Sequence, residues 1–289
     1  MKKIFLILSL VVFLCAGCVM PTDPVYITAT TGPVCYFTQF LCQDTPLQVQ
    51  QLITETVSCL HDYSLSVAQM RTLGASETVI ISGAGLEDFM DDLLVNRVSI
   101  DCSKNVPLLD CSEEHDHDHG HDHEHEADAH IWLAPENAKI MATNICDGLC
   151  VRYPQFEAVF RSNLVKLQQK LDELQQYAEE NLADLKTREL ITFHDGFAYL
   201  ADSFDLTIVA AIEEESGSEA SAKELVGLIS LIEQSNIPAI FTEYNGSVSA
   251  AGIIARETGV GVFTLDMAMN GDYFEIMYRN IDTIKEALG

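Results

Sequence analysis

Short apolar or β-branched runs alternate along this chain with stretches that carry helical signals, and this order restricts the possible folds more than any other feature. The predicted strands cover residues 25–31, 78–82, 189–193, 207–212, 239–243 and 260–265. A capping box from Ser221 to Glu224 predicts a helix to about Ser235, and Pro135 suits the first turn of a helix to about Cys150. Because strands that alternate with helices form parallel sheets, we predict an α/β fold with Rossmann-like sheets.

No glycine or proline occurs between Pro154 and Gly196. Apolar residues recur there at spacings of four and three, which places one set on a single helix face: Phe160, Leu164, Leu167, Leu171 and Leu174. Roughly 30 helical residues would extend about 45 Å. We therefore predict a rigid helix within 153–188 that joins an N-terminal lobe (25–152) to a C-terminal lobe (189–289). A coiled coil is the alternative, but it needs more sustained heptads.

The N-terminus has the composition of a bacterial export signal. Two lysines precede IFLILSLVVFL, an apolar run of eleven residues that is shorter than the roughly 20 needed to span a bilayer. It ends in CAGC, which resembles a lipobox with Cys18 as the lipidated residue, although Cys15 stands where Leu or Val is usual. We predict a signal peptide (1–17), a lipidated linker (18–24) and anchoring at the outer face of the cell membrane. An ordinary cleaved signal peptide is the alternative.

Acidic residues outnumber basic ones by 44 to 16, which gives a formal charge of −28. A surface this acidic repels nucleic acid and attracts cations, so we expect no nucleic-acid partner. Seven cysteines follow Cys18, so at least one thiol stays unpaired in the monomer that we expect. Cys102 and Cys111 are spaced for a small loop closed by a bridge. Cys146 and Cys150 fall four apart on the predicted helix, where a bond and two buried thiols both remain open.

The segment EEHDHDHGHDHEHE, residues 113–126, alternates histidines with carboxylates and contains no apolar residue. Its histidines are His115, His117, His119, His121, His123 and His125. Such a run cannot form a core, and metal contact is the usual role of histidine-rich tracts. A solvated charge run without a binding role is the alternative.

Three histidines lie outside this segment: His61, His130 and His194. His194 and Asp266 directly follow predicted strands, and Glu243 ends one. Ligand-binding groups of open α/β sheets gather at the carboxyl ends of strands. Three imidazoles with a carboxylate or water suit tetrahedral Zn²⁺. The spacing by itself does not establish that the three rings converge.

Six longer motifs make the pattern more specific. They are HDYSLSVAQM (61–70), SGAGLEDFM (82–90), AHIWLAPENA (129–138), ITFHDGFAYLADSFDL (191–206), SEASAKELVGLISLIEQSNIPAIFTE (218–243) and YFEIMYRNIDTIKEAL (273–288). Together they resemble the substrate-binding lipoproteins of bacterial zinc ABC transporters, in which an acidic histidine-rich loop also precedes the second metal ligand. The resemblance extends from about residue 25 to residue 289.

The resemblance implies two α/β lobes joined by a long helix, with a metal ion held between the lobes. His61, His130 and His194 fall on the metal-binding histidines of the family, and Asp266 falls on a carboxylate that completes the coordination in some members. Manganese-binding relatives carry Glu at the position of His194, so Zn²⁺ is expected rather than Mn²⁺.

Two departures from the family pattern concern groups near the expected site. Leu60 stands where some relatives carry a metal-reaching Glu, and LDMA at 265–268 replaces Leu-Asp-Pro-Leu. Since a ligating imidazole usually donates its other N–H to a carboxylate, we expect Glu243 to support one ring, with Asp195 as a weaker candidate.

The expected function is therefore the capture of extracytoplasmic Zn²⁺ and its delivery to the permease and ATPase of an ABC transporter, without catalysis. One alternative is an extracytoplasmic zinc hydrolase with Glu243 or Glu87 as the base, but HExxH and a nucleophile elbow are both absent from the sequence. A zinc buffer or adhesin without a transporter is a second alternative.

Overall fold

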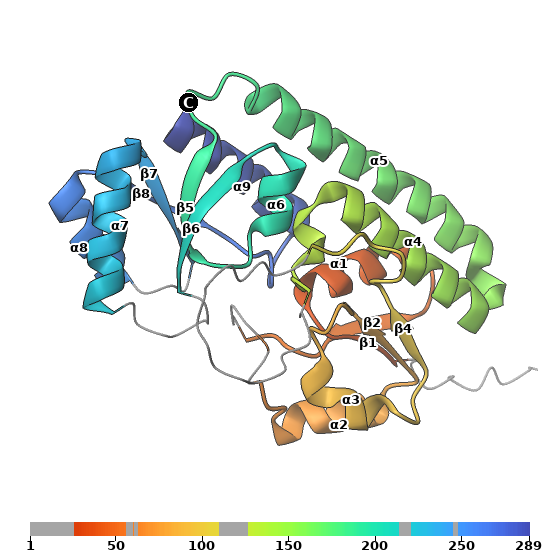
Figure 1. Cartoon of the computed structure of the whole chain (residues 1–289). Coiled ribbons are helices and arrows are strands. Elements are labelled where there is room, and N and C mark those ends of the chain that lie inside the picture. Colours follow the sequence, from red (N-terminus) through yellow and green to blue (C-terminus); the bar gives the residue numbers. More distant parts are fainter. Residues whose placement is uncertain (1–25, 56–59, 61–62, 110–126, 214–220, 245–247) are drawn as a thin grey trace, which may run out of the picture.

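The computed structural model describes residues 26–55, 60, 63–109, 127–213, 221–244 and 248–289. Within them the chain forms two parallel sheets with helices packed around them (Figure 1). The strands are β1 (Tyr26–Ala29), β2 (Gln48–Gln51), β3 (Thr78–Ile81), β4 (Ser99–Asp101), β5 (Glu189–His194), β6 (Thr207–Glu213), β7 (Ala239–Glu243) and β8 (Gly261–Leu265). The sheets have the orders β2-β1-β3-β4 and β6-β5-β7-β8, which confirms the predicted two-lobed α/β architecture.

Helices connect the strands within each lobe, as parallel pairing requires. The helices are α1 (Gly32–Leu41), α2 (Val67–Ala75), α3 (Asp91–Leu94), α4 (Pro135–Arg152), α5 (Glu157–Asn181), α6 (Ala198–Ser203), α7 (Ala222–Ser235), α8 (Val248–Thr258) and α9 (Tyr273–Leu288). Short 3₁₀ turns are η1 (Asp88–Met90), η2 (Ile131–Leu133) and η3 (Pro154–Phe156). No helix among the described residues is both long and apolar enough to cross a bilayer.

The long helix α5 has 25 residues and lies within the predicted range of 153–188. Its predicted apolar stripe is buried, with Phe160, Leu167, Leu171 and Leu174 fully shielded. The helix packs on α1 and α4 of the first lobe and on α9 of the second (Figure 1). The apolar face of α5 is therefore buried against helices of both lobes. The same face would be the seam of a coiled coil, so the 4-3 spacing here reflects packing on the lobes.

The two edge strands of the N-terminal sheet, β2 and β4, are not predicted by the sequence pattern. β2 reads QVQQ and has no fully buried residue, and β4 contributes only SID. Both lie at the edges of their sheet, where one side of the strand has no strand partner. Backbone pairing with β1 and β3 forms these strands, rather than an apolar pattern of their own.

The predicted starts of α7 and α4 are confirmed. Ser221 Oγ accepts the backbone N–H of Glu224 at 3.3 Å, and Glu224 Oε2 accepts the backbone N–H of Ser221 at 2.6 Å. Both halves of the capping box are therefore present. Pro135 begins α4, which continues to Arg152.

The described cysteines are buried thiols, and none is bonded to another described cysteine: Cys35, Cys42, Cys102, Cys146 and Cys150. Cys146 and Cys150 thus remain two thiols on successive turns of α4. Cys59 and Cys111 lie outside the described residues, so the suggested bridge between Cys102 and Cys111 is not tested. Burial raises the pKa of the Cys35, Cys42 and Cys146 thiols to about 12, which keeps them protonated and unreactive.

Candidate metal site

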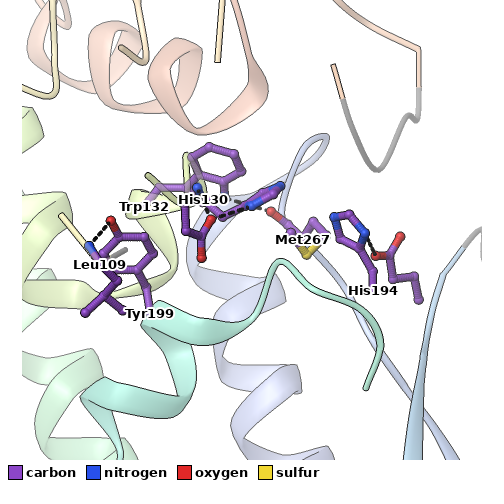
Figure 2. Close-up of polar contacts among 8 residues, drawn as sticks. Leu109, His130, Trp132, His194, Tyr199 and Met267 are labelled. Atoms are coloured by element: carbon purple, nitrogen blue, oxygen red, sulfur yellow. Dashed lines mark hydrogen bonds and ion pairs between the residues drawn. The ribbon is translucent and has the colours of Figure 1, made fainter. Parts of the chain in front are cut away.

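Imidazoles from the two lobes meet between them. His130 precedes η2 in the N-terminal half, and His194 ends β5 in the C-terminal half. Their ring centroids are 5.4 Å apart with an interplanar angle of 89°, and both residues are less than a tenth exposed (Figure 2). The structure therefore brings two of the three predicted histidines together, although 64 positions of sequence separate them.

Asp128 holds the ring of His130 in place. Its Oδ1 lies 2.8 Å from His130 Nδ1 and also accepts the backbone N–H of His130 at 2.8 Å. Because a carboxylate accepts a proton rather than donating one, Nδ1 carries the hydrogen and Nε2 keeps its lone pair. His130 is thus prepared to bind a cation through Nε2. Nothing in the sequence distinguishes Asp128 from the many other acidic residues of the chain.

Glu243 lies beside His194 at the end of the neighbouring strand. Parallel pairing of β5 with β7 brings the two strand ends together, and His194 Nδ1 is 3.8 Å from Glu243 Oε1 (Figure 2). Both side chains are less than a tenth exposed. This arrangement is compatible with the expected support of a ring by Glu243. Asp195, the weaker candidate, has an exposed side chain.

The loop after β8 closes one side of the imidazole pair. Trp132 in η2 is fully buried, and its Nε1 donates to the carbonyl of Met267 at 2.8 Å. The ring of Trp132 also packs edge-on against His130, with centroids 5.4 Å apart. Tyr273 at the start of α9 donates to the carbonyl of Trp132 at 2.7 Å. The C-terminal half therefore anchors the segment that carries His130.

The carboxylate of Asp266 has partners on its own side of the loop. Its Oδ2 accepts from Arg279 Nη2 at 2.9 Å, and its Oδ1 accepts the backbone N–H of Ala268 at 2.9 Å. The amide of Asn280 bonds both backbone groups of Asp266. Among the described residues, no group of three His, Cys, Asp or Glu side chains is arranged to hold a metal ion. Asp266 thus does not join His130 and His194 in such a group here.

Several predicted residues lie outside the part of the chain that the structure describes. They are His61, Cys18 and the loop histidines His115, His117, His119, His121, His123 and His125. The ends of the histidine-rich loop are nevertheless described. The backbone N–H of Asp128 donates to the carbonyl of Leu109 at 3.1 Å. The backbone N–H of Leu109 in turn donates to the hydroxyl oxygen of Tyr199, in the C-terminal lobe, at 2.9 Å. The described residues on either side of the loop, Leu109 and Asp128, are therefore in contact, and Asp128 is two residues before His130.

Glu87, the second base considered for a hydrolase, is buried at the carboxyl ends of β1 and β3. Its carboxylate accepts from Thr30 Oγ1 at 2.5 Å and from the backbone N–H groups of Ser82 and Gly83 at 2.8 and 2.9 Å. Burial raises the pKa of Glu87 to about 7. These contacts give Glu87 a structural role in holding the loop after β3, because its oxygens are occupied by its own lobe.

Two parallel α/β lobes, one long connecting helix and facing imidazoles at the junction are the features of a two-lobed receptor for a small solute. The chain belongs to the family described as zinc-uptake complex component A, periplasmic, which matches residues 27–287. This membership confirms the resemblance noted in the sequence motifs. The family consists of solute-binding receptors rather than enzymes.

Similar proteins agree with this assignment. The zinc-binding lipoprotein AdcA of Streptococcus pneumoniae is 29% identical over 99% of this chain, and the zinc-binding protein AdcA of Streptococcus pyogenes is 27% identical over 74% of it. The chain spans 61% and 42% of the lengths of these two relatives. A putative metal-binding protein of Treponema pallidum is 26% identical over 96% of this chain and 93% of its own length.

Solved structures show the same fold. A crystal structure of ZnuA superposes with a TM-score of 0.81 at 27% identity, covering 92% of this chain and all of that chain. The Zn(II)-bound ZnuA-like domain of Streptococcus pneumoniae AdcA superposes with a TM-score of 0.77 at 25% identity, covering 92% and 99%. The two-lobed architecture therefore extends over nearly the whole chain.

Proposed function

We propose that this chain is an extracytoplasmic receptor that captures Zn²⁺ between its lobes and delivers it to the permease and ATPase of an ABC transporter. The observation that carries this proposal is the meeting of the His130 and His194 rings, one from each lobe, at the lobe junction. An ion held by both rings would bind one side chain from each lobe and so link the lobes. Membership of a zinc-uptake family supports the same cargo.

In this proposal His61, His130 and His194 supply three neutral nitrogens, and Asp266 or water supplies the fourth position. Such a set suits tetrahedral Zn²⁺, whereas a carboxylate in place of His194 would favour the harder Mn²⁺. The hydrogen bond from His130 Nδ1 to Asp128 leaves Nε2 for the ion. Glu243 supports His194, with Asp195 the weaker candidate for this role. The chain performs no catalysis on its cargo.

The histidine-rich loop collects zinc for this site. The residues on either side of it, Leu109 and Asp128, are in contact next to His130, which supports a role for the loop close to the imidazole pair. A tethered weak binder raises the local concentration of its ligand to about the millimolar range. We further propose that the mature chain is a monomer and that lipidation of Cys18 anchors it to the outer face of the cell membrane.

The experiment that tests the proposed function measures Zn²⁺ affinity by competition with a chromogenic chelator. Alanine variants of His61, His130 and His194 should each lose the tight site, because removing one of three nitrogens leaves too few donors. His115→Ala, the same chemical change in the loop, is the matched control and should keep the tight site.

Tight zinc binding by both His130→Ala and His194→Ala would contradict the proposal. Hydrolysis of an ester or peptide that disappears in His194→Ala would instead support the hydrolase. Delivery to a transporter is tested separately, by zinc uptake in cells that carry the wild-type chain or the His194→Ala variant.

A further inference from the structure

Met267 occupies the place beside the imidazole pair that the family pattern gives to proline. We propose that its thioether is a donor at the site of His130 and His194 and extends the site to soft monovalent cations, the class of Cu⁺ and Ag⁺. This inference rests on the proposed function, because it uses the same two imidazoles. It adds a second class of cargo, recognised by sulfur rather than by a carboxylate.

The side chain of Met267 lies against His194. A Cβ added to Gly196 would be 2.5 Å from Met267 Cε, 2.7 Å from His194 Cδ2 and 3.0 Å from His194 Nε2. The methyl end of the thioether and the Cδ2–Nε2 edge of the imidazole therefore both lie beside Gly196. Figure 2 shows the side chain of Met267 beside the imidazole pair, with its sulfur on the side of His194.

The backbone holds Met267 in this place. Trp132 donates to its carbonyl, and the next residue, Ala268, has a positive φ of 57°. A left-handed conformation is costly for a residue with a Cβ, so the surrounding contacts must maintain it. The N–H of Ala268 is bound by Asp266, which completes a tight turn. Met267 is only 5% exposed, and its side chain is confined to the lobe junction.

The hard oxygen donor of the same loop is engaged elsewhere. The carboxylate of Asp266 binds Arg279 and the N–H of Ala268, and Asn280 fixes its backbone. The loop therefore presents a thioether to the imidazole pair, while its carboxylate pairs with a cation of α9. A neutral sulfur ligand favours soft ions, whereas carboxylates favour hard ones. Two imidazoles and a thioether also add no negative charge, which suits a monovalent ion.

Nuclear magnetic resonance of the full chain labelled with ¹³C at the methionine methyl groups tests this assignment, with Ag⁺ as the probe. The resonance that disappears in Met267→Leu identifies Met267. In the wild type, Ag⁺ should shift this resonance. The Ag⁺ concentration at half-shift should rise at least about tenfold in His194→Ala, because the two side chains would share one ion. Met269→Leu changes the second methionine of the same loop, equally buried, and should leave the Ag⁺ response of Met267 intact.

The outcomes separate this inference from the proposed function. A Met267 resonance that Ag⁺ leaves in place, in a protein that binds Zn²⁺ tightly, would overturn the thioether assignment and leave the zinc receptor standing. The same would follow if Ag⁺ shifted Met267 equally well in wild type and His194→Ala. A chain that binds neither cation at His130 and His194 would overturn both.

Discussion

At the residue scale, Asp128 contributes to the site without being a proposed metal ligand. One of its oxygens bonds both the backbone N–H and the ring Nδ1 of His130. This double contact fixes the ring orientation and its tautomer before an ion arrives. A preoriented ligand loses less conformational entropy on binding, which increases affinity.

We expect Asp128→Asn to weaken Zn²⁺ binding about 10- to 100-fold. The neutral amide is a weaker acceptor for the Nδ1–H of His130 than the negatively charged carboxylate. Chelator competition measures the change, and circular dichroism confirms the fold. Asp184→Asn removes the same charge from an exposed position before β5, at the strand end opposite His194, and should bind zinc as the wild type does. Equal affinity in both variants would remove the role given to Asp128.

Glu87 gives a pH-dependent prediction. Its pKa is raised from 4.5 to about 7 by burial, so between these values the folded chain holds a proton that the unfolded chain releases. The free energy of unfolding therefore falls as pH rises through this range, by about 2 to 3 kcal/mol from this one group. Glu87→Gln cannot titrate and should lack this part of the slope.

Urea unfolding of the metal-free wild type and Glu87→Gln at pH 5 and pH 8 measures the difference. The fall in stability from pH 5 to pH 8 should be larger in the wild type than in the variant. Parallel pH profiles for the two proteins would show that Glu87 ionises in the fold as easily as it does in the unfolded chain.

The candidate histidines can be predicted from the sequence, whereas the side chains that orient them cannot. His130 stood out because imidazole is a metal ligand, whereas Asp128 is one of many acidic residues in an acidic chain. The sequence flagged LDMA at 265–268 as a departure, but not the direction of its side chains. Asp266 pairs with Arg279, and this contact depends on how α9 packs beside β8. Contacts between residues of different elements leave no pattern in the local sequence.

At the scale of elements, predictability follows burial. Strands β5 and β7 are almost entirely buried and read as apolar runs, so their positions were found to within a residue. Strands β2 and β4 lie at the sheet edges and are less buried, so pairing with their neighbours decides their conformation. The helix α5 was found because its buried face repeats over the whole of its length.

The capping box of α7 provides a test at this scale. Ser221→Ala removes the acceptor for the Glu224 N–H and should lower the free energy of unfolding by about 1 kcal/mol. Ser230→Ala changes the same residue type within α7, where alanine is the better helix former, and should be neutral or slightly stabilising. Chemical denaturation of both variants measures the difference, and equal stability would show that the cap contributes nothing.

At the scale of the whole molecule, the loop of residues 113–126 is expected to be separate from the fold that grips the ion. The residues on either side of it, Leu109 and Asp128, are hydrogen-bonded to each other, so we expect the two lobes to fold without the loop. The tight site then depends on the lobes alone, and the loop adds weaker sites. An unperturbed imidazole binds metal only when neutral, so collection by the loop should weaken below about pH 6.5.

We expect deletion of residues 113–126 to leave one tight Zn²⁺ site and to remove the weaker ones. Isothermal titration gives the number and affinity of both classes. A variant of full length with serine at all six loop histidines is the matched control, and it should behave as the deletion does. Loss of the tight site in either protein would show that the loop supplies a ligand.

The contact of α1 with the start of α9 also constrains how the protein can mature. Tyr36 meets Asp272 across 236 positions of sequence, and the rings of Phe37 and Tyr273 pack 4.8 Å apart. The packing of α1 is therefore complete only after the start of α9 has been synthesised. Any segment of the chain that ends before α9 leaves the ring of Phe37 without this cover, and exposed apolar surface of this kind promotes aggregation.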